Sequence, residues 1–331
     1  MGITVRISQE EKKKLDVYDI EKLWQEVCTN VFETAKVEPR LGTKDEFFRM
    51  NWEFEVDKNR YKTALKSDLM NVKEYTLFDM HNFGSGINFC FNNKNQIELW
   101  TSFPTTYSEI VGFYKLVNLI CQKLNITEFQ RGSMGEFEIV NISQLDWFVE
   151  LGINDTLIML MRVKKQLEEG SERISINGVN NPISLGADAI SKFELDLPLK
   201  GNIDNINKVM YNYEKYMHDL QKEDLFYAVF KLYQIEHEGE KTIQGFMSVP
   251  VNCDTIIPKH PSTEFYFGVN RYDTSKISKF NVSLEHSNGK YYEIEYSKFI
   301  ETIDYDTQRQ YDADHVVVVL NQELIDEICQ M

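Results

Sequence analysis

Two short acidic stretches near the C-terminus carry residue types suited to metal chemistry. Asp304-Tyr-Asp306 and Asp312-Ala-Asp314-His315 place carboxylates two residues apart, and the second stretch ends on a histidine. Carboxylate oxygens are the ligands that Mg²⁺, Mn²⁺ and Ca²⁺ prefer, and imidazole adds a nitrogen ligand. Asp312, Asp314 and His315 are therefore candidate metal ligands, although the spacing and central glycine of an EF-hand are absent. The alternative is that these side chains cap a loop and the entry to a strand.

A second candidate lies in the segment from Asp79 to Gly86. Asp79 and His81 are candidate catalytic residues, because they could act as an acid–base pair beside a flexible Gly-Ser-Gly loop. The loop lacks the lysine and the strand-to-helix setting of a phosphate-binding loop. Ordinary turn residues are the alternative. The other histidines show no ligand spacing, and no hydrolase, zinc-protease or Walker A motif occurs, so no cofactor is expected.

The acidic stretches belong to a wider concentration of negative charge. The chain of 331 residues has 52 acidic and 36 basic residues, a net charge of -16. Between Glu293 and Glu327, ten carboxylates accompany only two cations, Lys298 and Arg309. A chain this acidic is a poor candidate for binding nucleic acid, which requires a basic surface.

This concentration predicts a docking face for a basic protein partner. We place it at four carboxylates, Asp304, Asp306, Asp312 and Asp314. Clustered like charge is self-repulsive, and a basic partner relieves the repulsion while the field steers its approach. The alternative is a solvated acidic surface that maintains solubility.

The cysteines and the apolar runs indicate the compartment. The five cysteines are odd in number, far apart and without a Cys-x-x-Cys pair, which favours reduced, buried side chains. The polar N-terminus lacks a signal peptide, and the longest apolar runs, 157–161 and 316–320, are too short for a membrane span. We therefore expect a cytoplasmic protein with no membrane partner.

Hydrophobic periodicity predicts the main helices and several strands. Apolar residues at helical spacing predict helices over 20–32, 106–124 and 203–220, with Thr106 and Glu109 as a capping box. A helix from Ser143 is expected to break near Gly152, and a second helix to end at Gly170. Alternating or apolar runs predict strands over 48–56, 193–197, 265–269 and 316–320, and Asn321 is expected to cap a final helix.

Turn residues between apolar runs predict a series of hairpins. They span 87–103, 127–141, 173–185, 225–251 and 279–296. The fold class is therefore α+β, with antiparallel sheets and helices packed on one face.

The order of elements suggests an internal duplication. Residues 86–141 and 173–251 both read as a hairpin, a strand ended by proline, a long helix and a hairpin, which is a repeated β-β-α-β-β module before a C-terminal α+β block. A chance likeness between α+β segments is the alternative. The domain boundary is expected at Gly170-Ser171, which gives regions 1–170 and 171–331.

Three stretches resemble a family of uncharacterised Gram-positive bacterial proteins that is known only as a domain of unknown function. They are 174–186, the segment from Tyr233 through Gly245 to Pro261, and Tyr311 to His315 with the valine run that follows. The resemblance lies mainly in the second half of the chain. It implies a bacterial cytoplasmic protein and carries over no activity.

These observations favour a non-enzymatic acidic binding module, comparable to immunity proteins and anti-factors, that docks a basic protein. An enzyme or ligand-binding protein that uses a divalent metal or an Asp/His pair is the main alternative. A structural or self-associating protein is a third interpretation. The sequence does not indicate the oligomeric state.

Overall fold

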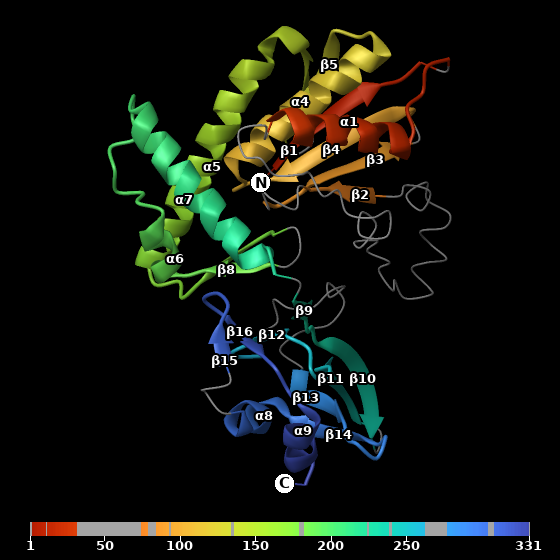
Figure 1. The fold of residues 1–331 in the computed structure, drawn as a ribbon, viewed down its shortest axis with the longest axis vertical. Helices are drawn as coiled ribbons and strands as arrows, with labels where there is room; N and C mark the ends of the chain where they lie inside the picture. Colours follow the sequence, from red (N-terminus) through yellow and green to blue (C-terminus); the bar gives the residue numbers. More distant parts are fainter. Residues whose placement is uncertain are drawn as a thin grey trace. The chain divides into compact units, whose positions relative to one another are not determined.

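The computed structural model describes residues 2–10, 12–31, 74–78, 84–92, 94–133, 136–178, 182–223, 225–237, 240–261, 277–303 and 308–330. They form two compact units, a first unit that ends at Lys222 and a second unit that begins at Glu223 (Figure 1). Each unit has its own hydrophobic core. The fold is α+β with predominantly antiparallel sheets, as predicted.

The first unit is built on a six-stranded antiparallel sheet of order β2-β3-β4-β1-β5-β6. The strands are β1 (Gly2–Ser8), β2 (Glu74–Leu77), β3 (Ile87–Asn92), β4 (Gln96–Ser102), β5 (Glu128–Ser133) and β6 (Glu136–Asn141). Along β1, Ile3, Val5 and Ile7 are buried, whereas the residues between them are half-buried. This alternation means that one face of the sheet carries the core.

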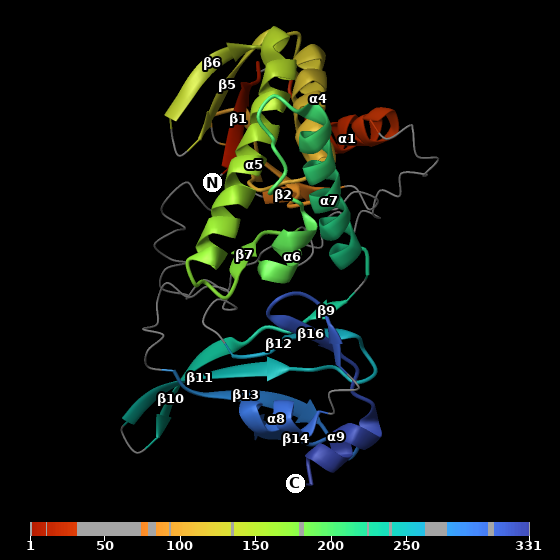
Figure 2. The same cartoon turned by 90° about the vertical axis from the view of Figure 1, so that its left-hand side faces the viewer.

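Helices cover that face of the sheet (Figure 2). They are α1 (Val17–Val31), α4 (Tyr107–Leu124) and α5 (Leu145–Glu168), the last preceded by the 3₁₀ turn η2 (Ile142–Gln144). α4 is buried over much of its surface because it packs against both α1 and α5. It begins where predicted, since the Thr106 hydroxyl accepts a hydrogen bond from the Glu109 N–H.

The predicted break at Gly152 is wrong, because α5 is continuous from Leu145 to Glu168. A Cβ at Gly152 would lie 2.8 Å from Cγ2 of Ile110 on α4. The glycine therefore allows a close approach of the two helices instead of ending one of them.

Residues after Gly170 complete the first unit. They form the two-stranded sheet of β7 (Ile174–Ile176) and β8 (Ile183–Leu185), followed by α6 (Ala187–Lys192) and α7 (Ile203–Gln221). The predicted strand over 193–197 is wrong. Phe193 and Leu195 are both buried, but Glu194 between them has φ +57°, so the segment is a turn.

Two larger predictions on organisation differ from the structure. Side chains of β7, β8, α6 and α7 belong to the same core as the six-stranded sheet, so the units divide at Lys222 and not at Gly170. The segments 86–141 and 173–251 also do not fold alike. The first contributes neighbouring strands to one sheet, whereas the second is divided between the two units.

The second unit contains two four-stranded sheets, of order β10-β11-β13-β14 and β15-β16-β12-β9. The strands are β9 (Phe226–Tyr227), β10 (Lys231–His237), β11 (Glu240–Ser248), β12 (Thr255–Pro258), β13 (Ile277–Glu285), β14 (Tyr291–Glu295), β15 (Gln308–Gln310) and β16 (His315–Val318). Two short helices, α8 (Tyr296–Thr302) and α9 (Gln322–Ile328), add to its core. The side chain of Asn321 caps α9, as predicted, by accepting from the Leu324 N–H.

The five predicted hairpins are present among the described strands. The predicted strands over 48–56 and 265–269 lie outside the described residues. None of the described helices combines the length and the apolar character needed to cross a membrane. Cys28, Cys90 and Cys121 are buried, and burial raises the pKa of the Cys121 thiol to about 12, as expected for an inert core residue.

Candidate functional site

The turn before β16 places the three predicted metal ligands in the interior of the second unit. Asp312, Asp314 and His315 are 4%, 2% and 0% exposed. Oδ1 of Asp312 accepts hydrogen bonds from the N–H groups of Asp314 and His315, both at 2.9 Å. The carboxylate therefore closes the turn on itself, which is the loop-capping alternative of the sequence analysis.

The same carboxylate orients the histidine. Nδ1 of His315 lies 2.7 Å from Oδ1 of Asp312. Nε2 of the ring lies 3.2 Å from the hydroxyl of Tyr227 on β9. Nδ1 is best satisfied as the donor, because the carboxylate oxygen accepts, and Nε2 then accepts the tyrosine proton. The result is an Asp312–His315–Tyr227 chain of hydrogen bonds.

Sheet topology explains why residues so distant in sequence meet. β12 pairs antiparallel with β16 and parallel with β9, so the entry to β16 and the end of β9 lie at the same end of the sheet, on either side of β12. Tyr227 was missed by sequence reasoning, because no local pattern around it indicates a partner at His315. The i, i+3 spacing of Asp312 and His315 was the only available signal.

Tyr227 alone of these three side chains has appreciable exposed surface. Burial, followed by the nearby negative charge of Asp312, raises the pKa of Tyr227 well above its usual value. The hydroxyl therefore remains protonated at neutral pH and donates its proton to the hydrogen bond with Nε2 of His315, so that towards a ligand the tyrosine oxygen acts as an acceptor. Such a chain can orient the tyrosine oxygen, whereas the imidazole is too deeply buried to contact a ligand.

The site residues predicted from sequence divide into two groups. Asp312 and Asp314 are buried, so neither presents its carboxylate as a docking contact, and Oδ1 of Asp312 instead accepts N–H groups of the turn. Within the described ranges, no group of three His, Cys, Asp or Glu side chains is placed to hold a metal ion. Asp79, His81, Asp304 and Asp306 lie outside the described residues.

A second buried carboxyl, in the first unit, was not predicted as a site. Oε1 of Glu109 accepts hydrogen bonds from the hydroxyls of Ser85, at 3.0 Å, and Thr101, at 2.9 Å. Ser85 comes from the Gly-Ser-Gly loop, and its hydroxyl also lies 3.2 Å from that of Thr105. Desolvation by burial raises the pKa of Glu109 above its usual value, against the effect of these donors. The carboxyl and its hydroxyls touch directly, so the cluster is a packed polar core.

One known protein family matches nearly the whole chain. The model of the family described as domain of unknown function (DUF4299) matches residues 2–328. The chain belongs to this family. No curated protein and no solved structure matches it.

The surface of the second unit of this DUF4299 chain retains a set of exposed carboxylates. They are Glu293 and Glu295 on β14, Glu301 on α8, and Glu323 and Glu327 on α9. On β14 they alternate with Tyr292 and Ile294, which are half-buried, and Ile294 packs against the core. β14 is an edge strand of its sheet, so one acidic row borders an open edge.

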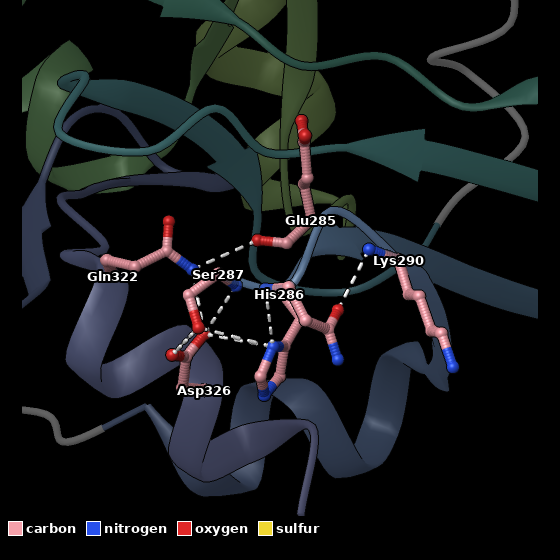
Figure 3. A network of polar contacts seen from close by, with 7 residues as sticks. Glu285, His286, Ser287, Lys290, Gln322 and Asp326 are labelled. Atoms are coloured by element: carbon pink, nitrogen blue, oxygen red, sulfur yellow. Dashed lines mark hydrogen bonds and ion pairs between the residues drawn. The ribbon is translucent and has the colours of Figure 1, made fainter.

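A polar network ties the β13–β14 hairpin to α9 (Figure 3). Asp326 of α9 accepts hydrogen bonds from both the N–H and the hydroxyl of Ser287 in the turn. Gln322 donates to the Glu285 carbonyl and to Asp326. The network therefore holds the acidic strand and the acidic helix in a fixed relation.

The serine, histidine and aspartate of this network are not arranged as a catalytic triad. Nδ1 of His286 accepts the N–H of Asn288 at 3.0 Å, so that nitrogen is a turn acceptor. The hydroxyl of Ser287 lies 3.3 Å from Nδ1 of His286, but it donates its proton to the closer Asp326 carboxylate, as a serine activated by a histidine base would not. The hydrogen bonds from Ser287 lower the pKa of Asp326 to about 2, which keeps this carboxylate charged. The network acts as a clamp between elements.

Proposed function

We propose that this protein is a non-enzymatic binding protein whose second unit docks a basic protein partner through the exposed carboxylates of β14, α8 and α9. The observation that carries the proposal is the acidic row of Glu293 and Glu295 on the edge strand β14. This revises the predicted docking residues, since Asp312 and Asp314 are buried, but keeps the predicted partner. The same class includes immunity proteins and anti-factors.

Two observations indicate that β14, α8 and α9 form a common acidic surface: β14 and α8 are consecutive in the chain, and the polar clamp joins the β13–β14 hairpin to α9. β14 leads directly into α8, which buries Tyr296 and Phe299 and exposes Glu301. α9 buries Ile325 and Ile328 and exposes its glutamates. Since the clamp joins α9 to the hairpin, the three elements present their charges without a large loss of conformational freedom on binding.

Closely spaced negative charges on this surface favour a positively charged partner. Carboxylates held on fixed elements repel each other in the free protein, and a basic surface relieves that repulsion. Long-range attraction also accelerates encounter, and salt screens it over a distance of about 10 Å at 0.1 M. Binding through this surface is therefore expected to weaken steeply with ionic strength.

We further propose that the protein acts in the bacterial cytoplasm. Its cysteine usage and its resemblance to Gram-positive proteins support this location. A basic partner would then be a protein of the same compartment.

Affinity capture from host lysate, with a matched control, tests the proposal. Wild type, Glu293→Lys/Glu295→Lys, and Glu136→Lys/Glu138→Lys would each be immobilised, and proteins retained at low salt would be released by stepped salt and identified by mass spectrometry. The control pair has the same spacing on β6, an edge strand of the first unit, and is also exposed. Both double variants change the net charge equally.

We expect one basic protein to bind the wild type and the β6 variant and to be lost from the β14 variant. Melting temperatures of the three proteins should agree, because all the altered side chains are exposed. Equal capture by all three proteins, or capture of no basic protein by wild type, would contradict the proposal.

The Asp312–His315–Tyr227 chain favours a second candidate function, a ligand-binding protein or enzyme whose ligand contacts the Tyr227 hydroxyl. A melting-temperature screen of small metabolites and divalent cations would test it, since a ligand that binds the native state raises the melting temperature. We expect a ligand-induced rise in melting temperature that disappears in Tyr227→Phe and persists in Glu293→Lys/Glu295→Lys. A shift that survives Tyr227→Phe would count against this candidate.

A further inference from the structure

We infer that the outer face of α5 is a self-association surface that joins two copies of this chain with their α5 helices antiparallel. The face is defined by Trp147, Asn154, Ile158, Met161 and Lys165. Their spacing of seven, four, three and four residues places them along one line of a helix with 3.6 residues per turn. Figure 2 shows α5 running down the front of the first unit.

Three of these side chains are large, apolar and exposed. Trp147, Ile158 and Met161 are 52%, 49% and 51% exposed. The opposite side of α5 already supplies the core, because Phe148 and Leu160 are fully buried. The outer apolar residues are therefore not needed to attach α5 to its own unit. Single exposed apolar residues are common, but a tryptophan, an isoleucine and a methionine aligned on one helix indicate a contact surface.

The charges beside this line identify the partner as a second copy. Asp146 and Glu150 are exposed in the N-terminal half of α5, and Arg162 and Lys165 are exposed in the C-terminal half. An antiparallel arrangement places the acidic half of each helix against the basic half of the other. A parallel arrangement would place like charges together, so the charge pattern selects the antiparallel one.

The apolar residues obey the same symmetry. With Asn154 at the centre, Trp147 lies seven residues before it and Met161 seven residues after it. An antiparallel pair centred there brings each tryptophan to the methionine of the other helix, and the small amides meet at the middle. This is the self-complementary pattern of a two-fold interface, in which the same patch serves both copies. Centred on Asn154, residues 145–163 of the two helices overlap, which at 1.5 Å per residue is a contact line about 28 Å long.

Light scattering coupled to size-exclusion chromatography tests the inference with the full chain. Wild type at micromolar concentration should have twice the 38.9 kDa mass of one chain. Ile158→Asp/Met161→Asp should be monomeric, because the change replaces two apolar contact residues with charges. Ile203→Asp is the matched control, since Ile203 is 71% exposed on α7, and it should remain dimeric. A monomeric wild type, or a dimer that survives the α5 double variant, would overturn the inference.

Charge exchange tests the antiparallel arrangement separately from the apolar contact. In Asp146→Lys/Glu150→Lys both halves of α5 are basic, and in Arg162→Glu/Lys165→Glu both halves are acidic. Each variant alone should be monomeric, and an equimolar mixture should form a heterodimer. A mixture that remains monomeric, with both variants folded by circular dichroism, would rule out the antiparallel pairing.

Discussion

Glu109 in the first unit and Asp326 in the second both accept a hydrogen bond from a serine hydroxyl, and their pKa values move in opposite directions. Glu109 accepts from Ser85, and its pKa is raised. Asp326 accepts from Ser287, and its pKa is lowered to about 2. Hydrogen-bond chemistry alone therefore does not decide the direction in which the pKa of a carboxyl moves in this protein.

Solvent access explains the difference. Glu109 is 7% exposed as a residue and lies on the buried side of α4, so the loss of hydration outweighs its hydroxyl donors. Asp326 is partly exposed and has a backbone N–H donor as well as the hydroxyl, so it keeps much of its hydration while it gains donors. The comparison indicates that burial makes the Glu109 carboxyl of the first unit easier to protonate. The second unit uses its carboxylate as a charged clamp.

Asp312 provides the strongest test of the importance of burial, because it is buried like Glu109 but has backbone N–H donors like Asp326. His315→Ala removes the imidazole and leaves the two N–H donors in place. We expect a loss of about 4 kcal/mol in the free energy of unfolding, since the buried Asp312 carboxyl then lacks its histidine partner and a cavity forms. Urea denaturation measures it. His260→Ala, at an exposed position of the same unit, should change stability by less than about 0.5 kcal/mol. A loss below about 1 kcal/mol for His315→Ala would mean that backbone donors suffice.

Gly84→Ala tests how closely Glu109 is packed. A Cβ at Gly84 would lie 1.8 Å from Oε2 of Glu109, so the buried carboxyl would have to move. We expect destabilisation of about 3 kcal/mol. In a Glu109→Ala background the same substitution should cost less than about 1 kcal/mol, because the clashing atoms are gone. Additive effects in this double-mutant cycle would show that the glycine is required for another reason.

Glu109→Gln tests the raised pKa of Glu109 through the pH dependence of stability. A carboxyl whose folded pKa is raised binds a proton on folding, so its contribution to stability is lost as pH rises from the usual value near 4.5 through the folded pKa. Glutamine keeps a similar shape without a charge. The stability of Glu109→Gln relative to wild type should therefore increase between pH 5 and pH 8, by about 1.4 kcal/mol for each unit by which the pKa is raised. A difference that is flat with pH would contradict the assignment.

Asp326→Asn should give the smallest effect, with the opposite sign. A carboxylate whose folded pKa is lowered contributes stability that is present at neutral pH and is lost as pH falls from 3.8 towards about 2. The variant should melt slightly below wild type at pH 7, and the gap should narrow at pH 3. Glu327→Gln, an exposed carboxylate on the same helix, is the control. A gap that stays constant with pH would assign the effect to lost contacts and not to charge.

Local patterns predicted the elements whose signals are contained within a few residues. The capping residues Thr106 and Asn321 begin α4 and α9, and the hairpin at Asn288-Gly289 forms where expected, because Gly289 has φ +75°. These predictions succeeded because a cap or a tight turn depends on its own backbone geometry.

Three features that sequence patterns misread or missed depend on long-range contacts. Gly152 is read locally as a helix breaker, but its contact with Ile110 makes it a packing residue. Glu109 is read as the second half of a capping box, but its carboxyl contacts Ser85, 24 residues earlier in the chain. The Asp312–His315 pair was within reach of sequence spacing, whereas Tyr227 required the order of strands β9, β12 and β16.

The two separate cores have a consequence for calorimetry. Because each unit buries its own apolar residues, heating is expected to produce two transitions in a differential scanning trace, with no single melting temperature for the whole chain. A bound molecule raises the transition of the unit that holds it. The heat-capacity peak that moves would therefore assign a newly found partner to one unit before any interface had been mapped.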